Sequence, residues 1–182
     1  MADSDNEFNT GDSGATGMEK VSAGSLHKGD LVMIKGKPCK VSSFSTAKTG
    51  KHGSAKAMVT GNDIFTNNKL ECTFSTGDNV DAPVVKRTEY SLINIDEDGF
   101  ATLLNDLGET KEDLRLPEGE DYHKEVGDTA RKIFEDGTKE CIVTVINAIG
   151  QEKIIAAREG KEVAWKFAYD VNPDISIHKP FY

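Results

Sequence analysis

Short apolar segments separated by polar turns make up the first half of the chain. The segments show no helical spacing, and their length and composition are typical of β-strands. We expect strands at residues 31–35, 39–44, 55–60 and 69–75, with turn sequences GKP at 36–38, GND at 61–63 and TNN at 66–68. Short antiparallel strands of this kind predict a small β-barrel.

The second half differs because one segment changes from strand spacing to helical spacing. We expect strands at residues 90–95, 100–104, 113–116, 141–146 and 153–157. Between the third and fourth of these, residues 121–135 predict a helix with Asp121 as N-cap and Gly137 as C-cap. Its apolar face is expected to consist of Tyr122, Val126, Ala130, Ile133 and Phe134. Three strands, a helix and two strands are the element order of an OB-fold, which binds oligonucleotides but also proteins or sugars.

Both ends of the chain depart from this pattern. Residues 1–19 are acidic, rich in small polar residues and poor in apolar ones, which predicts a disordered tail. We expect the first barrel at 20–87, the second at 88–157 and a C-terminal extension at 158–182. Within the extension, large apolar residues occupy every second position, namely Val163, Trp165, Phe167 and Tyr169. This period of two favours an added edge strand, with a docking segment or a nucleic-acid stacking surface as the alternative.

Composition narrows the class of protein. The chain has 182 residues, of which 37% are hydrophobic and 29% charged, as in globular proteins that bury a core in one or two domains. No apolar run approaches the roughly 20 residues of a membrane span, and the acidic start MADSDNEF lacks a signal-peptide pattern. Cys39, Cys72 and Cys141 are too widely spaced for a disulfide framework or a zinc site. We expect a cytoplasmic protein with no membrane partner.

The charge is distributed unevenly along the sequence. Residues 31–62 contain no Asp or Glu and six lysines, at positions 35, 37, 40, 48, 51 and 56. With a net charge of −9 for the whole chain and +6 for this window, the rest carries −15. A concentrated positive field attracts phosphate backbones even on an anionic protein. On charge alone, a solvent-exposed lysine face is an equal alternative.

The most distinctive segment is STAKTGKHGSAK at residues 45–56, between two expected strands. Gly50 and Gly53 allow backbone angles with positive φ, so the segment can form a tight turn that presents Lys51 at its tip. A nucleotide-binding P-loop is excluded, because Ser45 and His52 stand where that motif requires glycine and a hydroxyl residue.

No catalytic constellation is visible elsewhere. The four histidines are scattered without a metal-binding spacing, and no GxSxG motif or activated cysteine is present. We therefore expect no enzyme activity, no catalytic residue, no metal and no bound cofactor.

The segment 45–56 resembles the hypusine loop of the eukaryotic translation initiation factor 5A family, whose bacterial relatives include elongation factor P. Further similar motifs occur in the expected order, namely DIFT at 63–66, ST at 75–76, PVVKR at 83–87 and EDLRLPEG at 112–119. The resemblance covers about residues 20–157. It implies a mostly β fold of two small barrels, an N-terminal SH3-like barrel followed by a C-terminal OB-fold with one helix.

The resemblance also implies a function. Lys51 would be converted to hypusine: deoxyhypusine synthase transfers an aminobutyl group from spermidine, and deoxyhypusine hydroxylase adds a hydroxyl. The modified factor would bind the ribosome beside the P-site tRNA, promote peptide-bond formation at stalled sequences such as proline runs, and assist termination. The loop residues implied to contact tRNA or ribosome are Lys48, Thr49, Gly50, His52, Gly53 and Lys56.

Two departures from the family pattern are Ser54, where eukaryotic members usually have histidine, and the extension to Tyr182. Two other functions remain open. The basic loop and OB surface could form an RNA-binding module that acts off the ribosome, or the acidic remainder could make the chain a scaffold for basic proteins. The scaffold hypothesis predicts that Lys51→Arg is harmless.

Overall fold

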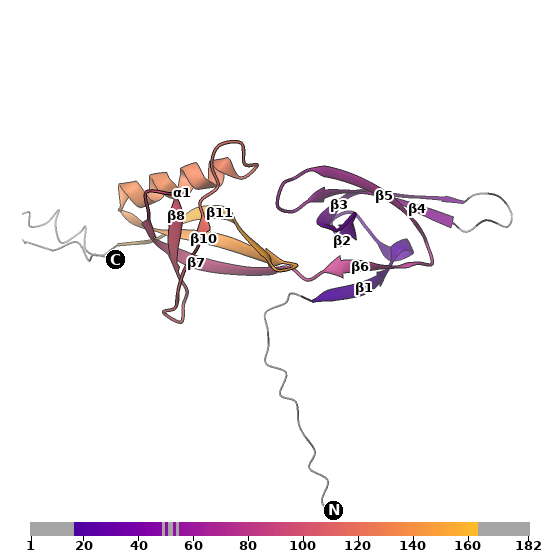
Figure 1. Ribbon diagram of the computed structural model, residues 1–182, viewed down its shortest axis with the longest axis horizontal. Helices are drawn as coiled ribbons and strands as arrows, with labels where there is room; N and C mark the ends of the chain where they lie inside the picture. Colours follow the sequence, from indigo (N-terminus) through magenta and orange to yellow (C-terminus); the bar gives the residue numbers. More distant parts are fainter. Residues whose placement is uncertain (1–16, 49, 51–52, 54, 164–182) are drawn as a thin grey trace, which may run out of the picture.

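The computed structural model describes residues 17–48, 50, 53 and 55–163, which form two β units joined in one chain (Figure 1). The first unit contains β1 Met18–Ser22, β2 Leu31–Ile34, β3 Lys37–Lys48, β4 Ala55–Asp63, β5 Lys69–Ser75 and β6 Asn79–Pro83. The second contains β7 Lys86–Ile95, β8 Phe100–Leu104, β9 Thr110–Arg115, α1 Lys124–Asp136, β10 Lys139–Ala148 and β11 Gln151–Glu162. The predicted fold class, mostly β with two β units and one helix, is confirmed.

The first unit is an antiparallel sheet in the order β2-β3-β4-β5, accompanied by the pair β1-β6. Apolar side chains from successive strands meet between them in one cluster, whose buried members include Val32, Ile34, Val41, Val59 and Val80. A 3-10 turn at Ala23–Ser25 ties the end of β1 to the turn between β5 and β6, because Ala23 N–H donates to the Asp78 carbonyl at 2.8 Å. The unit therefore buries a core of its own.

The second unit is a sheet in the order β11-β10-β7-β8-β9, with α1 packed against β10 and β11. Its element order, three strands, a helix and two strands, is the one expected from the sequence. Ala130 is fully buried in the core, and Val126, Ile133 and Phe134 pack around it. The apolar spacing thus places the predicted helical face on the sheet.

Two details of the predicted helix are wrong at its start. The N-cap residue is His123 rather than Asp121, and α1 begins at Lys124. Asp121 lies before the helix, where its Oδ1 accepts the His123 N–H at 2.8 Å and its Oδ2 pairs with Lys153 Nζ at 2.6 Å. Tyr122 precedes the helix and is 59% exposed, so it does not belong to the buried face. The C-cap prediction is confirmed: Gly137 adopts φ 61° and its N–H donates to the Ile133 carbonyl.

The turn expected at residues 61–63 is also wrong, since β4 continues through it. Gly61 is buried inside the sheet, where an added Cβ would lie 2.9 Å from the Cβ of Cys39 and 3.1 Å from Cδ1 of Ile34. The glycine thus serves close packing instead of a turn. Strands β1 and β6 were not expected, because each is short and gains its order from pairing with the other.

The domain limits remain predictions, although several strands start or end near them. β1 begins at Met18 and β7 at Lys86, while β11 continues past residue 157 to Glu162 and pairs there with Lys139. Most of the predicted tail (residues 1–16) and the apolar residues Trp165, Phe167 and Tyr169 lie outside the described residues. No helix of the described part has the length and hydropathy of a membrane span.

The reactivity of the cysteines tests the packing of the cores of both units. Cys39 and Cys141 are buried, and burial raises the pKa of each thiol to about 11, whereas Cys72 is partly exposed. At pH 8 only about one in a thousand of the two buried thiols is then the reactive thiolate. We expect iodoacetamide to add one group to the native protein, at Cys72, and three groups in denaturant. Intact mass measurement checks this, and rapid native labelling of Cys39 or Cys141 would contradict the packing.

Candidate functional site

The candidate segment 45–56 occupies the end of a long antiparallel hairpin formed by β3 and β4. Pairing runs from Cys39 opposite Asp63 to Lys48 opposite Ala55. In Figure 1 the ends of both strands at Lys48 and Ala55 lie at the side of the first unit away from β7–β11. The ends of both strands, at Lys48 and Ala55, therefore form one extremity of the described fold.

The two strands of the hairpin are supported unequally. β4 is paired on its other side by β5, with Lys56 opposite Ser75, and Thr76 N–H donates to the Ala55 carbonyl at 2.9 Å. Within the described part of the chain, β3 beyond Val41 pairs with β4 alone. Strand β4 thus anchors the hairpin to the sheet, while the outer edge of β3 is open to a partner.

Gly50 adopts φ +73°, and an added Cβ would meet no heavy atom within 4 Å. Glycine is therefore required at position 50 by the left-handed backbone conformation and not by a close contact. Gly53 is partly buried. Thr49, Lys51, His52 and Ser54 lie outside the described residues, so their roles remain predictions.

Lys48 and Lys56, the stem lysines, are exposed at the base of residues 49–54. Lys48 is opposite Ala55, whereas Lys56 is opposite Ala47. Because successive residues of a strand point to opposite faces, the two ammonium groups emerge on opposite faces of the hairpin. Neither forms an ion pair with any described residue. The stem therefore offers a free positive charge to a phosphate on either face.

The structure divides the basic window of the sequence into two regions. Lys40 and Lys48 are eight positions apart in β3, which at about 3.3 Å per residue corresponds to about 26 Å. Lys35, Lys37 and Lys40 thus lie at the end of the hairpin opposite the stem lysines. There Lys40, Lys28 and Arg87 line a groove between the two units. No sequence pattern had indicated a role for Lys28 or Arg87. No local motif could have found this group, because its members are far apart in the chain.

Among the described residues, no group of three or more His, Cys, Asp or Glu side chains could hold a metal ion. The site consists instead of free cations on a protruding hairpin, a composition suited to binding an anionic polymer.

Comparison with known families matches both units. Residues 17–78 match the family model "Translation initiation factor 5A-like, N-terminal". Residues 84–158 match the model "Eukaryotic elongation factor 5A hypusine, DNA-binding OB fold". The first matched range contains the β3–β4 hairpin, and the second contains the five-stranded sheet except for the last four residues of β11.

Individual relatives agree with these models. The chain is 43% identical over 159 residues to eukaryotic translation initiation factor 5A-1 of Saccharomyces cerevisiae, covering 87% of this chain and 97% of the relative. The same identity is found with factor 5A-3 of Arabidopsis thaliana, covering 98% of it. A solved structure of a factor 5A family protein from Naegleria fowleri superposes with TM-score 0.71 at 39% identity, over 78% of this chain and 98% of that one. An archaeal structure, from Methanococcus jannaschii, gives 0.59 at 32%, covering 79% and 97%.

Proposed function

Because the chain belongs to the eukaryotic translation initiation factor 5A family, whose members are translation factors, we propose that it acts on the ribosome beside the P-site tRNA. In this proposal Lys51 is converted to hypusine, and the modified side chain promotes peptide-bond formation at stalled sequences such as proline runs and assists termination. The partners are the ribosome, the P-site tRNA, deoxyhypusine synthase and deoxyhypusine hydroxylase, all in the cytoplasm.

The observation that carries the proposal is the hairpin with its stem lysines. β3 and β4 end at Lys48 and Ala55, at an extremity of the first unit, and Lys48 and Lys56, which form no ion pair with a described residue, place positive charge on both faces of the hairpin. This geometry supports insertion of a narrow cationic tip between RNA strands. Phosphates would bind Lys48 and Lys56, while Thr49, Gly50, His52 and Gly53 would shape the tip around Lys51.

The chemistry of the modification supports the same conclusion. A lysine amine is a compact, strongly hydrated charge on a four-carbon stem. Adding an aminobutyl group from spermidine and then a hydroxyl produces a longer arm with two amines and a hydroxyl, which can donate several hydrogen bonds along an RNA backbone. Orienting reactants can contribute up to about 7–11 kcal/mol in ideal intramolecular reactions. Only a fraction is needed here, since the ribosome supplies most of the positioning.

Mass spectrometry of the protein from its native cells tests the modification. Digestion with a protease that does not cut after lysine should yield a peptide containing residues 45–56 with the mass of one aminobutyl group and one oxygen added, located at Lys51. Lys48 and Lys56 in the same peptide serve as internal controls and should remain unmodified. An unmodified Lys51 in protein from actively translating cells would contradict the proposal.

Co-sedimentation with ribosomes tests the site of action. The modified protein should sediment with translating ribosomes, and a Lys48→Glu, Lys56→Glu variant should do so less, because both stem charges are reversed. Persistent absence of the parent protein from translating ribosomes would favour an RNA-binding module that acts elsewhere.

A further inference from the structure

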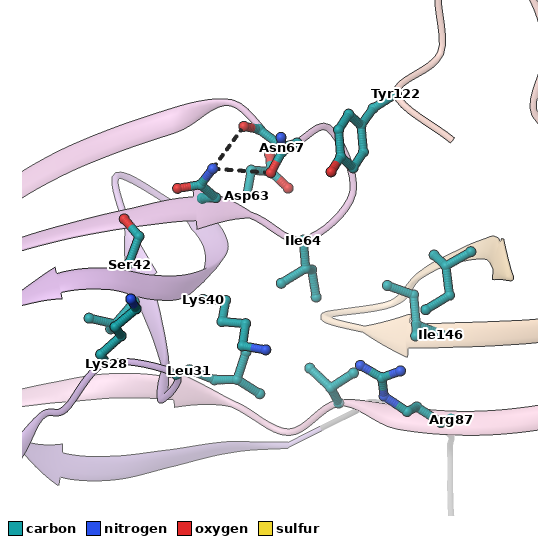
Figure 2. A pocket seen from close by; sticks show the side chains of 15 residues that line it. Lys28, Leu31, Lys40, Ser42, Asp63, Ile64, Asn67, Arg87, Tyr122 and Ile146 are labelled. Carbon is teal, nitrogen blue, oxygen red and sulfur yellow. Dashed lines mark hydrogen bonds between the residues drawn. The ribbon is translucent and has the colours of Figure 1, made fainter. Parts of the chain in front are cut away.

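A groove with a volume of about 610 Å³ lies between the two β units, at the end of the β3–β4 hairpin opposite the stem lysines. The first unit contributes Lys28, Lys40 and Ile64 to its lining, and the second contributes Arg87, Tyr122 and Ile146. Figure 2 shows the charged ends of Lys40 and Arg87 pointing toward one another across the junction of the units, with the Tyr122 ring at the opposite rim. The volume is within the range typical of small-molecule sites.

The two walls of the groove are fastened to each other. Phe65, 2% exposed, packs against Ile146 and Ala148 across the junction. Lys153 Nζ donates to the Phe65 carbonyl at 3.0 Å while pairing with Asp121. A buried apolar contact together with a hydrogen bond between units holds the groove in shape before any ligand binds, which reduces the ordering cost of binding.

The groove is positively charged. Its cations Lys28, Lys40 and Arg87 form no ion pair with any part of the chain that the structure describes. Among the described lining residues Asp63 has the one carboxylate. Asp63 is 6% exposed and its Oδ1 accepts the Phe65 N–H at 2.8 Å, so it is directed to the backbone of its own turn. Three cations in one groove of a chain with net charge −9 indicate an anionic ligand.

The rest of the lining indicates that the ligand is more than a bare anion. Apolar side chains cover the floor of the groove, namely Ile64, Val85, Ile146 and Ile155. Tyr122, 59% exposed, touches His123 in an edge arrangement with ring centroids 4.9 Å apart, which leaves ring surface free for stacking. Cations on one side of an apolar groove and an aromatic ring at the opposite rim match the phosphate and the base of one nucleotide.

We propose that this groove binds a nucleoside phosphate, with the phosphate held by Lys28, Lys40 and Arg87 and the base placed against Tyr122 and the apolar floor. The ligand is either a free mononucleotide or one nucleotide of a single-stranded RNA, which share this chemistry. Ser42 and Asn62 of the lining are each six positions from a stem lysine along the hairpin, or about 20 Å, so the ligand of the groove does not depend on the modification of Lys51.

Titration calorimetry with adenosine monophosphate tests the proposal on the full chain carrying Lys51→Arg, in which modification is impossible. We expect adenosine monophosphate to bind more tightly than either inorganic phosphate or adenosine alone. Arg87→Glu and Lys40→Glu should each weaken binding at least tenfold. Lys86→Glu is the matched control, because Lys86 is the exposed neighbour of Arg87 on β7 and does not line the groove; it should change affinity less than twofold.

Fluorescence anisotropy with a labelled RNA hexamer distinguishes a free mononucleotide from an RNA strand as the ligand. Binding that adenosine monophosphate displaces and Arg87→Glu weakens assigns the groove to an RNA strand, whereas binding of the mononucleotide without the hexamer assigns it to a free nucleotide. Amide shifts in NMR spectra of the Lys51→Arg chain give a readout that needs no groove variant, and they should concentrate at Lys40, Arg87 and Tyr122. No binding of either ligand at millimolar concentration, or shifts confined to residues 45–56, would overturn the proposal while leaving the function of Lys51 untouched.

Discussion

Lys51→Arg should remove the function of the chain in translation while leaving its fold unchanged. Arginine keeps the positive charge, but its guanidinium is not deprotonated in proteins and cannot accept the aminobutyl group as a lysine amine does. In cells whose only copy carries this substitution, we expect synthesis through a run of prolines to fall at least about tenfold, which corresponds to ~1.4 kcal/mol of lost transition-state stabilisation. A reporter with a proline run, normalised to one without, measures the effect.

Lys48→Arg is the matched control for this experiment. It makes the same chemical exchange in the same loop at an exposed residue that pairs with Ala55, and it retains the charge that we assign to phosphate binding. We expect reporter activity within about twofold of the parent. Equal activity of Lys51→Arg and Lys48→Arg would contradict the hypusine proposal and favour a scaffold that acts through its acidic surface.

Local sequence patterns correctly predicted the elements whose own apolar side chains are buried in the core. Strands at 69–75 and 100–104 appear as expected, because burial alternates along each: every second residue of β5 is partly buried, and Ala101 and Leu103 of β8 are fully buried. The helix face at Val126, Ala130 and Ile133 is correct for the same reason. The strand pair β1–β6 could not be predicted, since the sequence MEKVS has few apolar residues and is ordered by a partner about 60 positions later.

Long-range contacts also explain the errors. Asp121 has the sequence character of an N-cap and its Oδ1 accepts the His123 N–H, yet its Oδ2 is held by Lys153 of β11 and the regular helix begins three residues later. Gly61 has the character of a turn, yet it lies in β4 because Cys39 and Ile34 leave no room for a side chain there. In each case the deciding partner is distant in sequence, so a local pattern carries no sign of it.

The same reasoning applies to the two basic regions. The stem lysines could be anticipated because they flank one contiguous motif, whereas the groove combines Lys28, Lys40 and Arg87 from three separate segments. The β3–β4 hairpin relates the two regions, since it carries the stem lysines at one end and a wall of the groove at the other. Its length sets their separation.

Gly127→Ala should destabilise the second unit strongly, although alanine is the better helix former by about 1 kcal/mol. Gly127 lies in α1 directly against the segment that follows β9, and an added Cβ would be 1.9 Å from the Pro117 carbonyl oxygen and 3.0 Å from its carbonyl carbon. Both atoms belong to the backbone, so relief requires α1 and the segment at Pro117 to move apart. We expect a net loss of about 2 kcal/mol or more in the free energy of unfolding.

Displacement of α1 would also loosen Ala130, Val126 and Ile133, which pack on β10 and β11 through the same helix. Thermal unfolding followed by circular dichroism should show a midpoint lower by at least about 4 °C. Asp128→Ala is the control, because Asp128 is the exposed neighbour in α1 and its replacement adds helix propensity without a clash. It should change stability by less than about 0.5 kcal/mol. Equal stability of Gly127→Ala and Asp128→Ala would show that α1 does not approach Pro117 as closely as described.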